Sequence, residues 1–95
     1  MARTVRDTAL ATRSARLRLA PRAKPYWRLL EQGLHLGYRR RATGGTWIAR
    51  RRDSNGTYNE EKLGLADDLQ DANGVSILDF TQAQRAARTW WDSYR

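Results

Sequence analysis

The sequence contains no cysteine, one histidine, two prolines and only two lysines among its 95 residues. Without cysteine the chain can form no disulfide, no thiolate zinc site and no thiol nucleophile. The lone histidine, His35, cannot build a metal site by itself, so we expect no metal and no cofactor. No apolar run approaches the roughly 20 residues that a membrane-spanning helix requires, and no apolar signal segment follows Met1. We therefore expect neither secretion nor a membrane partner.

The short length limits the classes of function further. A chain of 95 residues corresponds to one ordinary domain, which makes a two-lobed enzyme with a cleft between the lobes an unlikely architecture. The tyrosines have no base or oxyanion donor near them in a recognisable catalytic pattern. We therefore predict no catalytic residues, no enzyme activity in this chain and no small-molecule substrate.

Charge is distributed unevenly along the chain. The net charge is +8, but residues 1–52 carry fourteen basic residues and only Asp7 and Glu31 as acids, a net of +12. Residues 53–95 carry a net of −4. All the basic residues except Lys24 and Lys62 are arginines, whose planar guanidinium forks onto phosphates and guanine edges. This bias favours a nucleic-acid partner over generic solubility.

The first 25 residues form a basic N-terminal arm in this interpretation. Weak helical periodicity is compatible with a short helix between Thr8 and Leu19, and Pro21 and Pro25 would end it. A disordered basic tail explains the same residues, and both alternatives stay open. The composition also resembles a transit peptide, although a basic arm accounts for it.

From Tyr26 onward the sequence is typical of short strands joined by glycine-containing turns. We predict strands over residues 26–30, 34–40, 46–52 and 58–63, the first as an extra edge strand. The connections contain Gly33, Gly44 and Gly56, and the Asn-Gly pair in the last is a strong hairpin signal. Connections this short predict antiparallel neighbours.

Alternation along these strands predicts an apolar face and a basic face. Leu36 and Trp47 fall on the apolar side, and Arg39 and Arg50 fall on the other. Two residues do not fit, because Ile48 lies on the basic side and Glu61 on the apolar side.

The remaining third of the chain predicts a loop and a helix. Residues 64–75 are polar and acidic, which indicates a solvated surface loop, and their carboxylates lack the ligand spacing of a calcium loop. Apolar residues then recur at spacings of three and four, which predicts an amphipathic helix from Thr81 to Tyr94. The helix begins either at a Thr81–Gln84 capping box or with Asp79 as its N-cap.

The predicted fold is α+β: a small antiparallel sheet of three or four strands packed against one C-terminal helix. Residues 1–25 form the arm, and residues 26–95 form the domain. The helix ends in aromatic residues with no terminating glycine or proline, so we expect the chain to be a piece of a longer protein. The predicted core is Leu34, Leu36, Trp47, Ala49, Leu63, Phe80, Ala83, Ala87 and Trp90.

The arginines are the only residues whose pattern suggests a specific chemistry. Arg39–Arg41 and Arg50–Arg52 end two neighbouring strands, so the triplets should lie toward opposite ends of the sheet. A sheet of two or three strands is narrow enough to enter the ~12 Å major groove, and Arg39, Arg50 and Arg52 should face the DNA. The alternative is a charged face that only meets solvent, and Glu60 on that face is able to pair with an arginine. The candidate DNA-binding residues are Arg28, His35, Arg39, Arg40, Arg41, Arg50, Arg52 and Lys62.

The tryptophans permit two other interpretations. Trp27 and Trp47 have the chemistry to stack on unpaired bases, but in a small sheet backed by a helix we expect them in the core. Trp90, Trp91 and Tyr94 on the helix suggest a second class of function, a module that docks on a partner protein or another protomer.

Five short runs, in this order and spacing, resemble the N-terminal domain of tyrosine-type phage integrases. The runs are Tyr26-Trp27-Arg28, residues 33–39 (GLHLGYR), 44–47 (GGTW), 63–68 (LGLADD) and 80–83 (FTQA). The resemblance covers residues 8–92. It implies a three-stranded antiparallel sheet on a helix that anchors the recombinase by placing the sheet in the major groove of arm-type sites.

The resemblance also carries expectations for the whole recombinase. It implies a role in DNA integration and recombination, double-stranded DNA and other protomers as partners, and a catalytic domain that is absent from this chain. It further implies a cytoplasmic, nucleoid-associated protein of bacterial or phage origin. Glu60 and Glu61 depart from the family pattern, since many relatives are basic in this strand.

Overall fold

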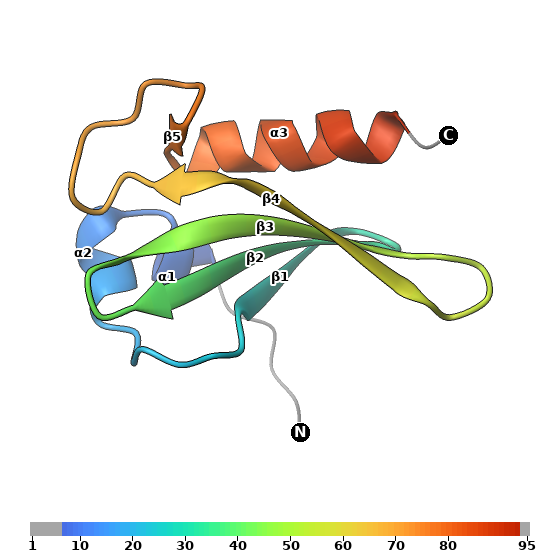
Figure 1. Cartoon of the computed structure of the whole chain (residues 1–95), viewed down its shortest axis with the longest axis horizontal. Coiled ribbons are helices and arrows are strands. Elements are labelled where there is room, and N and C mark those ends of the chain that lie inside the picture. The colour runs from blue at the N-terminus through green and yellow to red at the C-terminus, as the bar shows by residue number, and fades with distance from the viewer. Residues whose placement is uncertain (1–6, 94–95) are drawn as a thin grey trace.

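Four consecutive strands joined by short turns form an antiparallel meander, and a fifth strand pairs in parallel with the fourth (Figure 1). The structure is a computed structural model that describes residues 7–93. The α+β class is confirmed, but the sheet has five strands where three or four were predicted. The elements are α1 (Asp7–Leu10), α2 (Arg13–Leu17), β1 (Tyr26–Glu31), β2 (Leu34–Arg41), β3 (Gly44–Arg52), β4 (Tyr58–Ala66), β5 (Ile77–Leu78) and α3 (Phe80–Asp92).

The additional strand is β5, which is only two residues long and therefore too short to show an alternating pattern. Leu65 N–H donates to the Ser76 carbonyl at 2.9 Å, and Asp67 N–H donates to the Leu78 carbonyl at 3.2 Å. The Asn73 side-chain oxygen accepts three backbone N–H groups, from residues 75, 76 and 77, and thereby shapes the chain before β5. Part of the predicted acidic loop therefore extends the sheet.

Helix α3 lies across one face of the sheet and provides much of the core. It begins one residue earlier than predicted, because Asp79 is the N-cap: its carboxylate accepts from Gln82 N–H at 2.8 Å. The Gln82 side chain accepts in return from Asp79 N–H at 3.0 Å, which completes a capping box. The Asp79 alternative is thus confirmed. Tyr94, the predicted end of the helix, lies outside the described residues.

The core lies between the sheet and its helices. All nine predicted core residues are buried or pack against the core cluster. Prediction missed the fully buried Leu10 and Tyr38, as well as Leu78 and Ala66, which belong to the same cluster. No helix within residues 7–93 is long and apolar enough to cross a bilayer.

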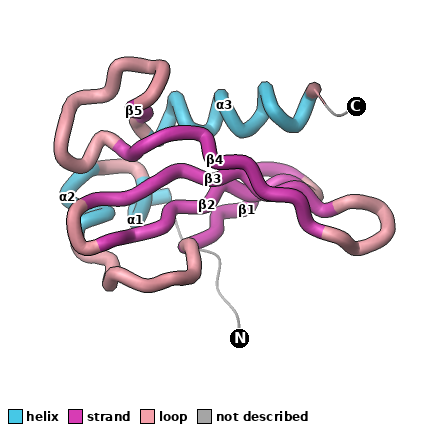
Figure 2. The backbone as a smooth tube through the Cα atoms, viewed as in Figure 1, coloured by secondary structure: helices cyan, strands magenta, loops and turns pink. Residues whose placement is uncertain are grey.

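Residues 7–19 pack onto the same face of the sheet as α3. The chain forms two short helices, and Thr12 caps the second by accepting from Ala15 N–H at 3.1 Å. Figure 2 shows α1 and α2 at the end of the sheet opposite the β3–β4 turn, with α3 extending toward that turn. Leu10 and Arg16 from these helices are buried, so the described part of the arm belongs to the domain and is not a disordered tail.

Arg16 anchors this segment through a buried polar cluster, which we call the Arg16 cluster. Its Nε donates to Asp68 Oδ1 at 2.9 Å, its Nη1 donates to the Leu10 carbonyl at 2.9 Å, and its Nη2 pairs with Asp67. The Tyr38 hydroxyl donates to Asp68 Oδ2 at 2.6 Å. Burial, reinforced by this hydrogen bond to Asp68, raises the pKa of Tyr38, so its phenol stays protonated. The prediction of a solvated acidic loop is therefore wrong for Asp68, whose side chain is 1% exposed.

Candidate nucleic-acid interface

The face of the sheet opposite the helices, here called the open face, carries most of the predicted DNA-binding residues. Strand register places His35 beside Arg50 and Ile48 beside Lys62. Because side chains alternate along a strand, every second residue of β2, β3 and β4 points to this side. No described helix packs on it. Six of the eight candidates lie there: His35, Arg39, Arg41, Arg50, Arg52 and Lys62.

The other two candidates do not join them. Arg28 pairs with Leu36 and Arg40 pairs with Gly45, so both side chains start on the helix side of the sheet. Arg40 is 8% exposed and donates to the Arg41 carbonyl. Side chains alternate along a strand, so three consecutive arginines cannot all face one partner. For this reason Arg40 does not lie with Arg39 and Arg41 on the open face.

The two arginine triplets lie toward opposite ends of the sheet, as predicted. Arg41 pairs with Gly44 at the β2–β3 turn, and Arg52 pairs with Tyr58 at the β3–β4 turn. The positive charge is therefore spread along the ribbon.

Arginines on the two sides of the sheet differ in their partners. On the helix side, Arg16 pairs with Asp67 and Asp68, and Arg51 pairs with Asp53 at 2.8 Å. On the open face no described carboxylate lies within 4.0 Å of any of the five cationic side chains. These five are Arg39, Arg41, Arg50, Arg52 and Lys62. The open face therefore keeps an uncompensated positive potential.

Glu60 is the single acid among them, and it does not neutralise its neighbour. Its Cα is paired with that of Arg50 across β3 and β4, yet the two side chains form no ion pair. Both the carboxylate and the guanidinium are left available to a ligand.

Two aromatic rings flank the Arg50 guanidinium. Its central carbon lies 4.1 Å from the Trp27 ring centre and 4.6 Å from the Tyr58 ring centre. Trp27 comes from β1 and Tyr58 from β4, so the rings reach Arg50 from opposite sides of β3. Both distances are typical of cation–π contacts. We call these three residues the Arg50 stack.

Trp27 was expected in the core and lies on the open face instead, whereas Trp47 is fully buried as predicted. The space for Trp27 exists because its partner in β2 is Gly37. A Cβ at Gly37 would come within 2.5 Å of the Trp27 ring. The pairing of Trp27 with Gly37 could have predicted this position, but the pairing can be recognised only when the register of β1 and β2 is known.

His35 stands beside the Arg50 stack with its ring edge-on to Trp27, at a centroid distance of 6.4 Å. Its Nδ1 is buried and has no hydrogen-bond partner in the described chain. Burial, and secondarily the charge of Arg50, lowers the pKa of His35 below its usual value of 6.5. At neutral pH the imidazole is uncharged, so His35 adds no positive charge to the face.

Substituting His35 tests this directly. Between its lowered pKa in the folded protein and 6.5, the unfolded chain binds more protons than the folded one, so stability falls as the pH drops through 6.5. We expect the free energy of unfolding of His35→Gln to fall less between pH 7.5 and pH 5.5 than that of the wild type, in urea titrations at both pH values. Identical pH dependence in the two proteins would contradict this account.

The aromatic residues of α3 are engaged within the domain. Trp90 packs against the core, and its ring lies 5.7 Å from the Arg51 guanidinium. The Trp91 ring lies over the β1–β2 turn, where a Cβ at Gly33 would come within 3.1 Å of it. These internal contacts give the protein-docking alternative no support.

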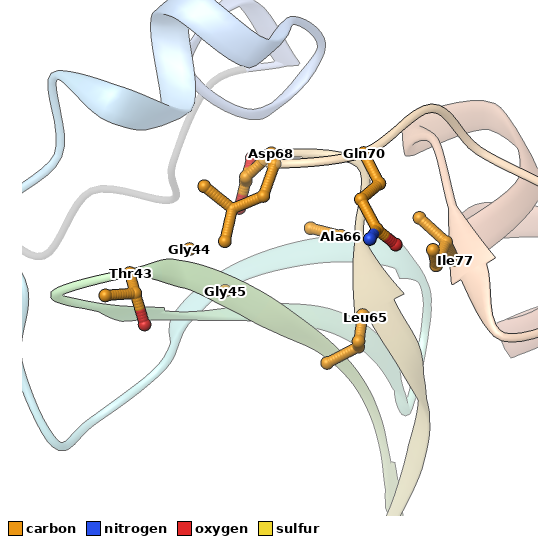
Figure 3. Close-up of a pocket in the computed structure, with 9 residues that line it drawn as sticks. Thr43, Gly44, Gly45, Leu65, Ala66, Asp68, Gln70 and Ile77 are labelled. Atoms are coloured by element: carbon orange, nitrogen blue, oxygen red, sulfur yellow. The ribbon is translucent and has the colours of Figure 1, made fainter.

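A shallow apolar pocket of about 230 Å³ lies at the other end of the sheet, beside the β2–β3 turn and β5 (Figure 3). Its only ionisable residue is Asp68, whose carboxylate is already bonded to Arg16 and Tyr38. Residues 7–93 also contain no group of three or more His, Cys, Asp or Glu side chains that could hold a metal ion.

Comparisons with protein-family models, with curated proteins and with solved structures found no match to this chain.

Proposed function

We propose that this domain binds double-stranded DNA through the open face of its sheet. The observation that carries the proposal is the separation of the arginines into two populations. Those on the helix side include ion-paired residues that stabilise the fold, whereas the five cations of the open face have no carboxylate partner. Cationic side chains that are spread along one surface and have no carboxylate partner are suited to a polyanion.

The shape of the open face fits the DNA major groove. Strands lie about 4.8 Å apart, so β2, β3 and β4, which carry the cations, span about 10 Å of the ~12 Å groove width, and β1 lies beside them at the edge of the sheet. Figure 1 shows the β3–β4 hairpin extending past the end of α3, so the helix does not obstruct it. Terminal residues of the ribbon would contact phosphates, and central residues would face base edges.

In this proposal the domain anchors a larger recombinase to DNA and performs no catalysis itself. The support is the resemblance of its ordered motifs to the N-terminal domain of tyrosine-type phage integrases, together with the α+β fold that the resemblance implied. Integration and recombination would then be the work of a catalytic domain that this chain does not contain, acting with other protomers in the cytoplasm of a bacterium.

The dependence of affinity on salt tests the proposal. If four or five of these cations each neutralise one phosphate, log K should fall with log salt at a slope of about −4 to −5. The slope is measured by fluorescence anisotropy of a labelled 20-base-pair random-sequence duplex, titrated with the protein between 50 and 300 mM KCl. A slope near zero, or no binding at 50 mM, would refute duplex binding by this face.

A further inference from the structure

We propose that Arg50 is the residue of this interface that discriminates bases, that the base it selects is guanine, and that Trp27 and Tyr58 position it. The inference rests on the proposed function, because it assigns a role within a DNA-bound open face. It concerns one side chain and its two neighbours, the Arg50 stack.

Arg50 occupies the part of the open face that would lie deepest in a groove. It is on β3, between His35 of β2 and Glu60 of β4 in the register. Arg41 and Arg52, in contrast, lie beside the turns at the two ends of the ribbon, where the backbones of a groove would run. Its place on the middle strand of the three favours contact of Arg50 with base edges, and the places of Arg41 and Arg52 beside the turns favour contact with phosphates.

Glu60 supports this assignment. An exposed carboxylate beside Arg50 would repel a phosphate brought to the same spot, whereas base edges carry no net charge. Glu60 thus lies at the place on the open face where no phosphate contact is required.

The Arg50 stack holds the guanidinium plane in place. Rings at 4.1 Å and 4.6 Å flank its central carbon, which restricts rotation of a side chain that otherwise has many rotamers. Its Nε is buried without a partner, but neither Nη group is among the buried unpartnered atoms, and neither makes a hydrogen bond within the described residues. The two Nη groups therefore reach solvent as a fixed fork.

A fixed orientation of the fork matters more for guanine than for a phosphate. Bidentate contact with guanine O6 and N7 requires two coplanar donors at a set spacing, and it is the commonest specific arginine contact in the major groove. A phosphate also binds the fork of an arginine, but its oxygens can be approached from many directions, so the side chain need not be held in one orientation. Two aromatic rings hold Arg50 in place, whereas Arg52 on the same strand has no such contact. This difference points to base discrimination at Arg50.

Selection from a randomised duplex library tests the inference. We expect the wild-type domain to enrich duplexes with a G·C pair at one fixed position, and Arg50→Lys to lose that preference by about tenfold or more while still binding random duplex. Arg52→Lys is the matched control, because it makes the same change on the same face outside the stack. It should keep the preference.

A second measurement needs no variant. In the selected duplex, 7-deazaguanine at the preferred position removes the N7 acceptor, and we expect wild-type affinity to fall about tenfold. The proposal is overturned if the wild type binds without any base preference, if Arg50→Lys keeps the preference, or if 7-deazaguanine binds as well as guanine. Each of these leaves duplex binding itself intact, whereas failure to bind any duplex at low salt overturns the proposed function.

The positioning role has its own test at Tyr58, which is half-exposed and therefore tolerant of substitution. Tyr58→Leu removes the ring and should reduce discrimination between guanine and adenine severalfold, while Tyr58→Phe keeps the ring and should restore it. A purely structural role would move the unfolding midpoint and leave discrimination unchanged. Equal discrimination by the two variants would overturn the role of Tyr58.

Discussion

Replacing Arg16 with methionine is expected to lower the free energy of unfolding by about 3 to 5 kcal/mol. The guanidinium is 1% exposed and satisfies Asp68, which is equally buried, while Asp67 retains some exposure. Without it, the Asp68 carboxylate keeps only the Tyr38 hydroxyl as a side-chain partner. Domains of this size are typically stable by only about 5 to 15 kcal/mol, so this single change approaches the limit of folding. Urea denaturation followed by tryptophan fluorescence measures the loss.

A second substitution separates lost charge pairing from lost packing. Asp68→Asn in the Arg16→Met chain removes the uncompensated charge but leaves an oxygen that can accept from Tyr38, so it should recover much of the stability. Arg18→Met, an exposed residue at the end of α2, is the control and should have little effect. If Arg16→Met and Arg18→Met behave alike, the Arg16 cluster does not hold the N-terminal segment on the sheet.

The parts of the fold that sequence could predict are those with a local cause. Helix α3 can be predicted because apolar residues recur every three or four positions and because Asp79 and Gln82, three residues apart, form a capping box. The first four strands can be predicted from alternating apolar and polar residues and from the glycines in the turns between them. The side of the sheet predicted for each residue of β2 and β3 was also correct. Once the strands are located, strict alternation of side chains determines on which side each residue lies.

The parts that sequence could not predict depend on distant partners. Burial of Arg16 requires Asp68, 52 positions away, and an isolated arginine in a weakly periodic segment carries no sign of it. The place of Trp27 on the open face depends on Gly37 in the next strand, and the Arg50 stack depends on the register of four strands. The position of Arg40 has a local cause, because alternation within Arg39–Arg41 already places its side chain on the opposite side of the sheet from its two neighbours.

The open face also predicts which arginines set the overall affinity for DNA. The triple substitution Arg39→Gln, Arg41→Gln and Arg52→Gln removes three unpaired cations and leaves the Arg50 stack intact. At 100 mM salt we expect affinity for a random-sequence duplex to fall about a hundredfold or more, and the magnitude of the salt slope to fall by about 3, because each lost phosphate contact removes nearly one unit. Stability should change little, because none of the three forms an ion pair within the described residues and the hydrogen bond that Arg39 Nε donates to the Ala23 carbonyl is exposed.

A matched control distinguishes this interface from a general attraction of a basic protein to DNA. Arg18→Gln, Arg85→Gln and Arg88→Gln remove the same charge from exposed positions on α2 and α3, the helices that cover the opposite face. Beyond the Debye length of about 10 Å at 0.1 M salt their field is largely screened, so this triple should weaken binding only severalfold and leave the salt slope nearly unchanged. Equal losses in the two triple variants would mean that net charge, and not the open face, carries the affinity. A large loss in the first variant alone would locate the DNA on the side of the sheet where the arginines have no acidic partners.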